Sequence, residues 1–221
     1  MEPRTAIVFG ATGMVGNILL EELINSADYS VIKIFVREST GISEPKVQEI
    51  ITDVSDPAGY SAKITGDDLF ICLGTTIKKA GSVANMEKID RDLPVRIAGQ
   101  ARKNGTKNIA VVSSIGAAKT SRNYYLRIKG EMETGILKLN FDNTVIVRPS
   151  MLLGERKEKR SGEMVGKVVM KTFQPVLIGK LLKYRAIHAG DVARAMILIM
   201  QKKREKNIFE SDELQKIARE Y

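Results

Sequence analysis

The sequence has very few of the side chains that most often form disulfides and metal sites. Its 221 residues include one cysteine (Cys72), one histidine (His188) and no tryptophan. A single cysteine excludes an internal disulfide and a cysteine metal cluster. A single histidine argues against a histidine-based metal site and against a Ser-His-Asp triad, so we expect no metal centre. Any chemistry must therefore depend on other groups.

Long hydrophobic runs are also missing. No apolar run is long enough to span a bilayer, and a short strand pattern follows Arg4 at once, which is unlike a signal peptide. We therefore expect no membrane association. The single cysteine fits a reducing compartment, and these features together predict a cytoplasmic protein.

Short β-prone runs alternate with helical patterns over the first 150 residues. The runs cover residues 5–9, 31–36, 47–51, 69–73, 109–112 and 144–147. Helical patterns follow the first run and occupy 86–103 and 124–139, while 78–85 is predicted to be a mobile loop. The alternation predicts an α/β fold of the Rossmann type, a doubly wound parallel sheet with helices on both faces.

The pattern loosens after residue 150. It predicts a charged loop over 154–163, a helix over 163–173, a helix that Asp191 caps, a strand over 207–209 and a final helix over 212–221. The length fits one domain, 1–221, to which residues 151–221 add a small extension on the substrate side.

The first crossing from strand to helix contains three glycines at three-residue spacing. Gly10 permits a tight turn, Gly13 lets the backbone approach a ligand closely, and Gly16 lets the helix pack close to the strand. The helix start offers unpaired N–H groups to an anion. This context predicts a site for a dinucleotide pyrophosphate. The alternative is a plain turn of an α/β domain that binds no nucleotide.

Three further positions refine the predicted cofactor site. Arg37 ends the second strand, where a guanidinium can pair with a 2′-phosphate and favour NADP(H) over NAD(H), although Glu38 keeps NAD open. Asp53 lies where a carboxylate can accept from the adenine amine, or it caps the next turn. Gly74, between Leu73 and Thr75, again permits close backbone approach at a strand end.

The net charge of +9 agrees with attraction of an anionic ligand, and equally with a solvated basic surface. Nucleic-acid binding is not expected, because no basic helix with interleaved aromatic residues is present.

A second group of residues suggests proton transfer. Tyr125 and Lys129 are four residues apart, so a helix places both on one face. A nearby ammonium lowers the pKa of a phenol from its reference value of about 10. Ser113 and Ser114 end the preceding strand, where a hydroxyl can hold a substrate oxygen. The alternative is a half-buried tyrosine with a lysine whose ammonium reaches solvent.

These stretches resemble an atypical short-chain dehydrogenase/reductase, and within it the Tat-interacting-protein-like branch of NAD(P)-binding proteins. The similar stretches are residues 9–16, 72–76, 90–92, 113–117, 125–131 and 148–154. The resemblance implies a Rossmann fold, bound NADP(H) and a Tyr-Lys-Ser catalytic set. Tyr125 and Lys129 match two of these positions. Ser113 and Ser114 both approximate the third, and we favour Ser114.

The resemblance also implies the cofactor contacts. The three glycines hold the pyrophosphate, which Thr12, Met14 and Val15 line; Arg37 meets the adenosine phosphate, and Pro149 and Ser150 flank the nicotinamide. The family often has an asparagine on the fourth helix, and none can be placed here, since Asn104 lies too near the helix end.

Two functions follow from this sequence. The first is an NADP(H)-dependent oxidoreductase that reduces a small carbonyl substrate under the loop 154–163 and near Tyr184, Arg185 and His188, where Arg156 and Arg160 could attract an anionic group. The second is a regulatory or redox-sensing protein that binds NADP(H) with little or no catalysis and acts through a protein partner. A homo-oligomer remains open.

Overall fold

The computed structural model describes residues 3–56, 59–154, 177–202 and 205–220. Its centre is a seven-stranded sheet with the order β3-β2-β1-β4-β5-β6-β9, in which all neighbours are parallel. The strands are β1 (Arg4–Phe9), β2 (Tyr29–Val36), β3 (Val47–Ile51), β4 (Asp68–Ile71), β5 (Asn108–Val112), β6 (Asn143–Arg148) and β9 (Ile208–Glu210). The predicted doubly wound parallel sheet is confirmed.

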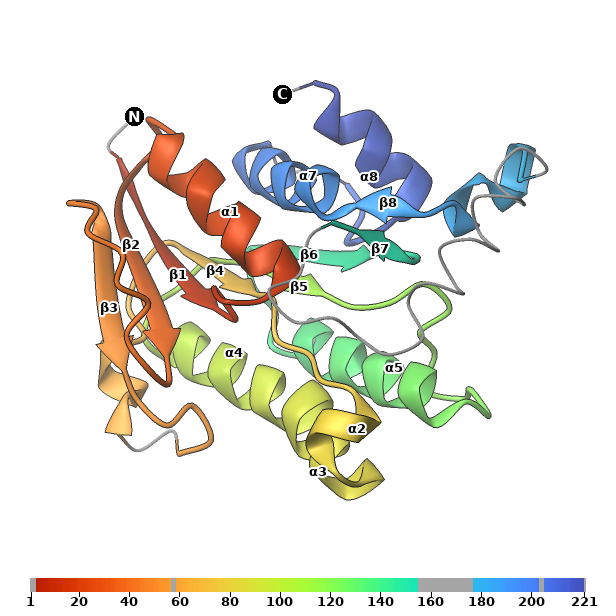
Figure 1. The fold of residues 1–221 in the computed structure, drawn as a ribbon, viewed down its shortest axis with the longest axis horizontal. Coiled ribbons are helices and arrows are strands. Elements are labelled where there is room, and N and C mark those ends of the chain that lie inside the picture. The colour runs from red at the N-terminus through yellow and green to blue at the C-terminus, as the bar shows by residue number, and fades with distance from the viewer. Residues whose placement is uncertain (1–2, 57–58, 155–176, 203–204, 221) are drawn as a thin grey trace.

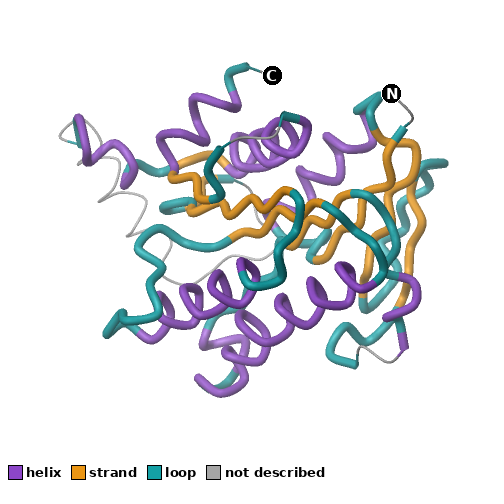
Figure 2. The backbone as a smooth tube through the Cα atoms, turned by 180° about the vertical axis from the view of Figure 1, so that it is seen from behind, coloured by secondary structure: helices purple, strands orange, loops and turns teal. Residues whose placement is uncertain are grey.

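Helices cover both faces of this sheet (Figure 1). On one face lie α1 (Met14–Asn25), α7 (Ala189–Gln201) and α8 (Ser211–Ala218); on the other lie α4 (Leu93–Lys103) and α5 (Tyr124–Leu137). Seen from behind, the strands form a layer between the two groups of helices (Figure 2). Each face has its own buried apolar cluster. Strands covered on both sides need continuous apolar runs, which explains why β1 and β4 are so hydrophobic.

The segment predicted to be a mobile loop, 78–85, is instead mostly helical. It contains α2 (Ile77–Ala80) and the start of α3 (Val83–Glu87). The hydroxyls of Thr76 and Ser82 accept hydrogen bonds from backbone N–H groups of the first turns and so cap both helices. Gly81, with φ of +77°, ends α2 between them. The prediction failed because both helices are too short to show an apolar period in the sequence, and their caps are single polar residues.

The helix predicted over 86–103 consists of three consecutive segments. α3 leads into one π-helical turn, η3 (Lys88–Asp92), and then into α4, with Pro94 in the first turn of α4. Proline is tolerated there because its missing N–H would have no helical partner. Wider π turns often occur at functional sites, and this one places Asp90 in the interior.

The C-terminal stretch contributes directly to the main sheet. β9 pairs with β6, and α8 starts at Ser211 with a reciprocal capping box between Glu210 and Glu213. The late strand and the final helix are therefore present, each shifted by one residue at its start. β7 (Leu152–Leu153) and β8 (Ile187–His188) form a separate two-stranded sheet, and η5 (Gly179–Tyr184) precedes β8.

Two further expectations concern this stretch. Asp191 does not cap α7, since the helix begins at Ala189 and Asp191 lies within its first turn. A carboxylate there still interacts favourably with the helix dipole. The predicted loop 154–163 and helix 163–173 lie outside the described residues, Gly154 excepted. Within the described part of the chain, no helix is both long and apolar enough to cross a membrane.

A buried polar cluster joins the amino ends of four neighbouring strands. Asp68, fully buried at the start of β4, forms an ion pair with Arg4 from β1. Its carboxylate also accepts hydrogen bonds from the Tyr29 hydroxyl of β2 at 2.7 Å and from Asn108 Nδ2 of β5 at 2.9 Å. Burial is the largest influence and raises the pKa of Asp68, while these partners oppose that shift. The carboxylate thus connects β1, β2, β4 and β5.

We predict that Asp68→Ala destabilises the fold by about 3 kcal/mol, because it leaves a buried hydroxyl, a partly buried amide and a partly buried guanidinium without their shared acceptor. Urea unfolding measures the change. The control is Asp142→Ala. The Asp142 side chain is 54% exposed and pairs with Arg102, so its loss should lower the free energy of unfolding by less than about 1 kcal/mol. Equal losses in the two variants would contradict the structural role of Asp68.

Candidate active site

The predicted site residues follow the carboxyl ends of five parallel strands, which all lie at one edge of the sheet. Gly10 follows β1, Arg37 follows β2, Gly74 follows β4, Ser113 follows β5 and Pro149 follows β6. Strand order reverses between β1 and β4. In open α/β sheets, ligands bind at this edge and next to this switch point.

The glycine turn has the geometry that the spacing predicts. Gly10 has φ of +85°, and a Cβ on it would lie 2.7 Å from the backbone of Cys72. A Cβ on Gly16 would lie 2.1 Å from the Gly10 carbonyl oxygen. No side chain larger than hydrogen fits at either position without movement of the backbone. The turn therefore packs tightly against the end of β4 on one side and the start of α1 on the other.

The start of α1 suits an anion. Gly13 is the N-cap residue, no side chain caps the helix, and the first turn contains no acidic residue. Thr12 and Gly13 are exposed, whereas the side chain of Val15 is buried in the core. Val15 can therefore offer only its backbone N–H to a ligand. Exposed N–H groups and the positive end of the helix dipole fit the pyrophosphate of a dinucleotide.

Arg37 and Asp53 are both exposed beyond the ends of β2 and β3. Asp53 accepts a hydrogen bond from the Ser55 backbone N–H at 2.9 Å. This bond is the main reason why the pKa of Asp53 is lowered, and the charge of Arg37 adds to it. Asp53 thus caps a turn, which was the alternative to a contact with adenine. Its contact with adenine stays a prediction, as does that of Arg37 with a phosphate.

Lys129 is buried next to the loop that follows β4. Its Nζ lies 2.9 Å from Oδ1 of Asp90, and the side chains are only 3% and 1% exposed. Oδ2 of Asp90 accepts a hydrogen bond from the Thr75 backbone N–H at 2.9 Å. A Cβ on Gly74 would lie 3.4 Å from Asp90 Oδ1 and 3.9 Å from Lys129 Nζ. The predicted residues Gly74, Thr75 and Lys129 therefore meet around Asp90.

The two candidate serines differ in their contacts. Ser113 is buried and donates to Glu133 Oε1 at 2.5 Å. The carboxylate of Glu133 also accepts from Arg148, whose Nε lies 2.8 Å and Nη2 2.5 Å away. Ser113 thus belongs to a network that joins β5, α5 and β6. Ser114 is half-buried, and among the described residues its hydroxyl has only a long contact of 3.4 Å with the Ile115 carbonyl. This difference favours Ser114 as the serine available to a ligand.

Tyr125 lies in the first turn of α5, which Asn123 caps by accepting hydrogen bonds from the backbone N–H groups of Tyr125 and Leu126. The Tyr125 ring is half-buried and packs against Ala80 and Met86 from α2 and α3. Its charge, when ionised, acts on Lys129. The helical spacing thus places the phenol and the ammonium near each other, as predicted.

The contacts of the remaining predicted residues are mainly structural. Pro149 is buried. The Ser150 backbone N–H donates to Ser211 Oγ at 2.7 Å, and the Ser150 hydroxyl donates to the Arg185 carbonyl. Nε of Arg185 is buried without a hydrogen-bond partner among the described residues. Tyr184 and His188 are exposed. Arg156 and Arg160 lie outside the described residues.

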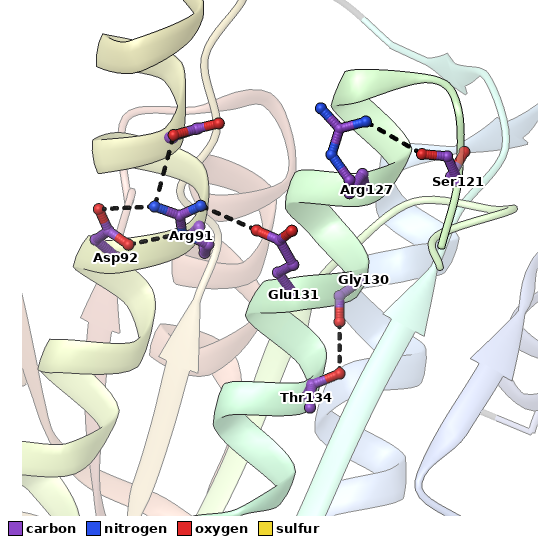
Figure 3. Close-up of polar contacts among 8 residues, drawn as sticks. Arg91, Asp92, Ser121, Arg127, Gly130, Glu131 and Thr134 are labelled. Carbon is purple, nitrogen blue, oxygen red and sulfur yellow. Dashed lines mark hydrogen bonds and ion pairs between the residues drawn. The ribbon is translucent and has the colours of Figure 1, made fainter. Parts of the chain in front are cut away.

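Charged side chains also gather on the solvent side of the contact between η3 and α5. Figure 3 shows Arg91 reaching from η3 to Asp92 and to Glu131 of α5. Glu87 is a third carboxylate near the same guanidinium, at 3.6 Å. Hydrogen bonds to Asp92 and then Glu131 raise the pKa of Arg91. This surface cluster holds η3 against the helix that contains Tyr125 and Lys129.

Two buried residues of this region were missed by sequence reasoning. Asp90 was noted only within the similar stretch 90–92, without a role, and Glu133 was not considered. A signal existed for Glu133, because it lies four residues after Lys129 and so on the same helix face. No local pattern indicates that Asp90 points inward, since that depends on the π turn of η3.

Comparison with known proteins gives independent evidence for the family of this chain. A family model described as NAD(P)H-binding matches residues 10–203. A mitochondrial protein named FMP52 from Eremothecium gossypii is 32% identical over 221 residues, 97% of each chain. Protein HTATIP2 from Rattus norvegicus is 33% identical over 171 residues, 76% of this chain and 70% of its own.

A solved structure supports the fold. A short-chain dehydrogenase/reductase superfamily protein from Agrobacterium tumefaciens, solved with bound NAD, superposes with a TM-score of 0.71 at 14% identity. The match covers 98% of this chain and 81% of the other. At this identity the likeness concerns the fold alone.

These relatives contradict the predicted cytoplasmic location. Fungal relatives with 32–38% identity are named as mitochondrial proteins. A low cysteine content separates reducing from oxidising compartments, but it does not separate one reducing compartment from another. The prediction depended on that content and on the lack of an apolar leader, and neither feature addresses mitochondria.

We predict that Gly16→Ala destabilises the protein by about 1–3 kcal/mol and weakens dinucleotide binding, because the new methyl group forces the start of α1 away from Gly10. Thermal unfolding and NADPH titration measure the two effects. The control is Gly99→Ala on α4, where the nearest atom to a new Cβ lies 3.9 Å away. This change should stabilise the helix by about 0.5–1 kcal/mol. A neutral Gly16→Ala would refute the close packing of the turn.

Proposed function

Because this chain belongs to the NAD(P)H-binding family, as an HTATIP2-like atypical short-chain dehydrogenase/reductase, we propose that it is an oxidoreductase that uses NADP(H) to reduce a small carbonyl substrate. The observation that supports catalysis most directly is the buried Lys129 one helical turn from Tyr125, beside the loop that follows β4. A lysine with no other purpose than to reach solvent would not be 3% exposed.

In this proposal, Tyr125 is the proton donor. A dinucleotide held at the glycine turn of Gly10, Gly13 and Gly16 would supply the hydride that the carbonyl carbon accepts. The Tyr125 hydroxyl donates its proton to the carbonyl oxygen, so that the products are an alcohol and a phenolate. The ammonium of Lys129 stabilises this phenolate. The Ser114 hydroxyl donates a hydrogen bond to the substrate oxygen and holds it near Tyr125.

Arg37 supports the preference for NADP(H). Its exposed guanidinium is free to turn toward a 2′-phosphate beyond β2, and the N–H groups of a guanidinium match phosphate oxygens in pairs. The adjoining residues Ser39 and Thr40 are held to β3 by Glu49, which accepts from the Ser39 hydroxyl and the Thr40 N–H at 2.8 Å each. The loop after Arg37 is therefore anchored before any ligand binds.

We predict that Tyr125→Phe lowers kcat for carbonyl reduction by at least about 100-fold, because the proton donor is lost. NADPH binding should stay the same. The matched control is Tyr124→Phe, which removes the neighbouring hydroxyl from a residue 36% exposed and should leave kcat unchanged. The measurement is a screen of carbonyl compounds followed by NADPH oxidation.

Full activity of Tyr125→Phe would remove Tyr125 from the mechanism. Tight NADPH binding by the wild-type protein without turnover of any carbonyl compound would instead favour the regulatory alternative, in which the cofactor is sensed and a protein partner is bound.

We further predict that Arg37→Ala weakens NADPH binding by about 10- to 100-fold, since one charge-assisted contact is lost. NADH binding should change little, because NADH lacks the 2′-phosphate. Isothermal titration of both cofactors measures the effect. The control is Arg102→Ala at the far end of α4, where the side chain is 37% exposed. Tighter binding of NADH than of NADPH by the wild-type protein would contradict the proposed preference.

A further inference from the structure

Asp90 has a position that the proposed reaction does not by itself explain. Its side chain is 1% exposed, yet it carries a carboxylate, and it lies in the only π-helical turn of the described residues. Burial of a charge is unfavourable unless the charge is paired. The partner is the ammonium of Lys129 at 2.9 Å, itself 3% exposed. Each ion therefore stabilises the other away from bulk solvent.

The two oxygens of Asp90 bind different parts of the site. Oδ2 accepts from the Thr75 N–H at 2.9 Å, which ties the loop after β4 to η3. Oδ1 faces Lys129 and has no hydrogen-bond partner among the described residues beyond this ion pair. The carboxylate thus holds three segments together: the loop with Gly74 and Thr75, the turn η3, and helix α5.

Besides Asp90, two other titratable groups act on Lys129, and one of them is already paired with an arginine. These two groups are Tyr125 and Glu133, and both lie on α5; each of them, when ionised, raises the pKa of Lys129. Glu133 is bound by Arg148 of β6 and by the Ser113 hydroxyl. From the loop after β4, Gly74 and Thr75 lie next to the pair, and neither of them titrates. Asp90 is thus the one carboxylate among the described residues that contacts the lysine directly.

The solvent side of the same interface is charged as well. Arg91, Glu87, Asp92 and Glu131 form the cluster drawn in part in Figure 3, and their side chains are 31–42% exposed. Water and salt screen charges at such positions strongly. Their effect on Lys129 is therefore weak compared with that of a buried carboxylate in contact.

We propose that Asp90 is a positioning residue, whose carboxylate holds Lys129 beside Tyr125 and sets the pH at which the Tyr125–Lys129 pair loses its first proton. The role of Tyr125 and Lys129 in donating a proton to a substrate rests on the proposed function. The ionisation of the pair does not, because it is a property of the protein without substrate.

The sign of the effect follows from charge alone. Burial by itself lowers the pKa of Lys129, but Asp90 and then Tyr125 outweigh it, so that the net shift is upward. Asp90→Asn removes one negative charge from the site. Lys129 then holds its proton less tightly, and a coupled pair with one negative charge fewer beside it loses its first proton at a lower pH.

The test is an NMR titration of the full-length protein with ¹³C-labelled tyrosine and lysine side chains, in which Tyr125→Phe assigns the tyrosine signal. In Asp90→Asn, the first deprotonation of the pair should move down by at least about one pH unit. The matched control is Asp92→Asn, the same change two residues away on the solvent side. It should move the titration by less than about 0.3 pH units, since an exposed charge is screened.

An unchanged first deprotonation in Asp90→Asn, or an equal shift in Asp92→Asn, would overturn the proposal. Asp90→Ser is the second variant, because its small uncharged side chain leaves room for water if the asparagine strains the fold. It should give the same downward shift. A purely structural role of Asp90 would weaken stability without any change in this titration.

Turnover supplies a separate readout. If the protein reduces a carbonyl compound, the alkaline fall of kcat should move to lower pH in Asp90→Asn by the same amount as the NMR titration, while KM changes little. If the wild-type protein shows no turnover, the proposed function fails, but the NMR titration still decides the role of Asp90. The two failures are therefore distinguishable.

Discussion

Lys129 and Asp90 are both removed from water, and each persists as an ion because the other lies 2.9 Å away. The pair also determines local structure. The carboxylate needs the π turn of η3 to reach inward, and the lysine needs the first half of α5 to lie against that turn. The loop after β4 then completes the arrangement through the Thr75 N–H. A site with a phenol, an ammonium and a close backbone approach therefore depends on one buried charge pair.

Polar groups at the two ends of the sheet have different tasks. At the amino ends, Asp68 collects donors from three neighbouring strands, and the result is a closed structural cluster. At the carboxyl ends, Glu133 has a similar task between Ser113 and Arg148. The Ser113 hydroxyl is bound to Glu133, whereas the Ser114 hydroxyl has no comparable bond among the described residues, which is why the proposed reaction uses Ser114.

The glycine turn and the charge pair divide the candidate site into two halves. The turn depends on the absence of side chains: Gly10 and Gly16 approach backbone atoms so closely that a methyl group would not fit. The other half depends on the presence of buried charge. The first half can be predicted from spacing because glycine has a unique steric property. The second half combines residues from η3 and α5, which are distant in the chain.

Local periodicity and spacing were enough to predict the α/β class, the parallel sheet, the glycine turn and the placement of Tyr125 and Lys129 on one helix face. The sequence did not indicate that 78–85 is helical, because isolated caps carry no period. Nor did it indicate that Asp90 faces Lys129. These contacts, and the different hydrogen bonds of Ser113 and Ser114, become apparent only in the folded structure. The physical reason is that burial and charge pairing arise between segments, and a residue's neighbours in the chain do not record which distant group will share its interior site.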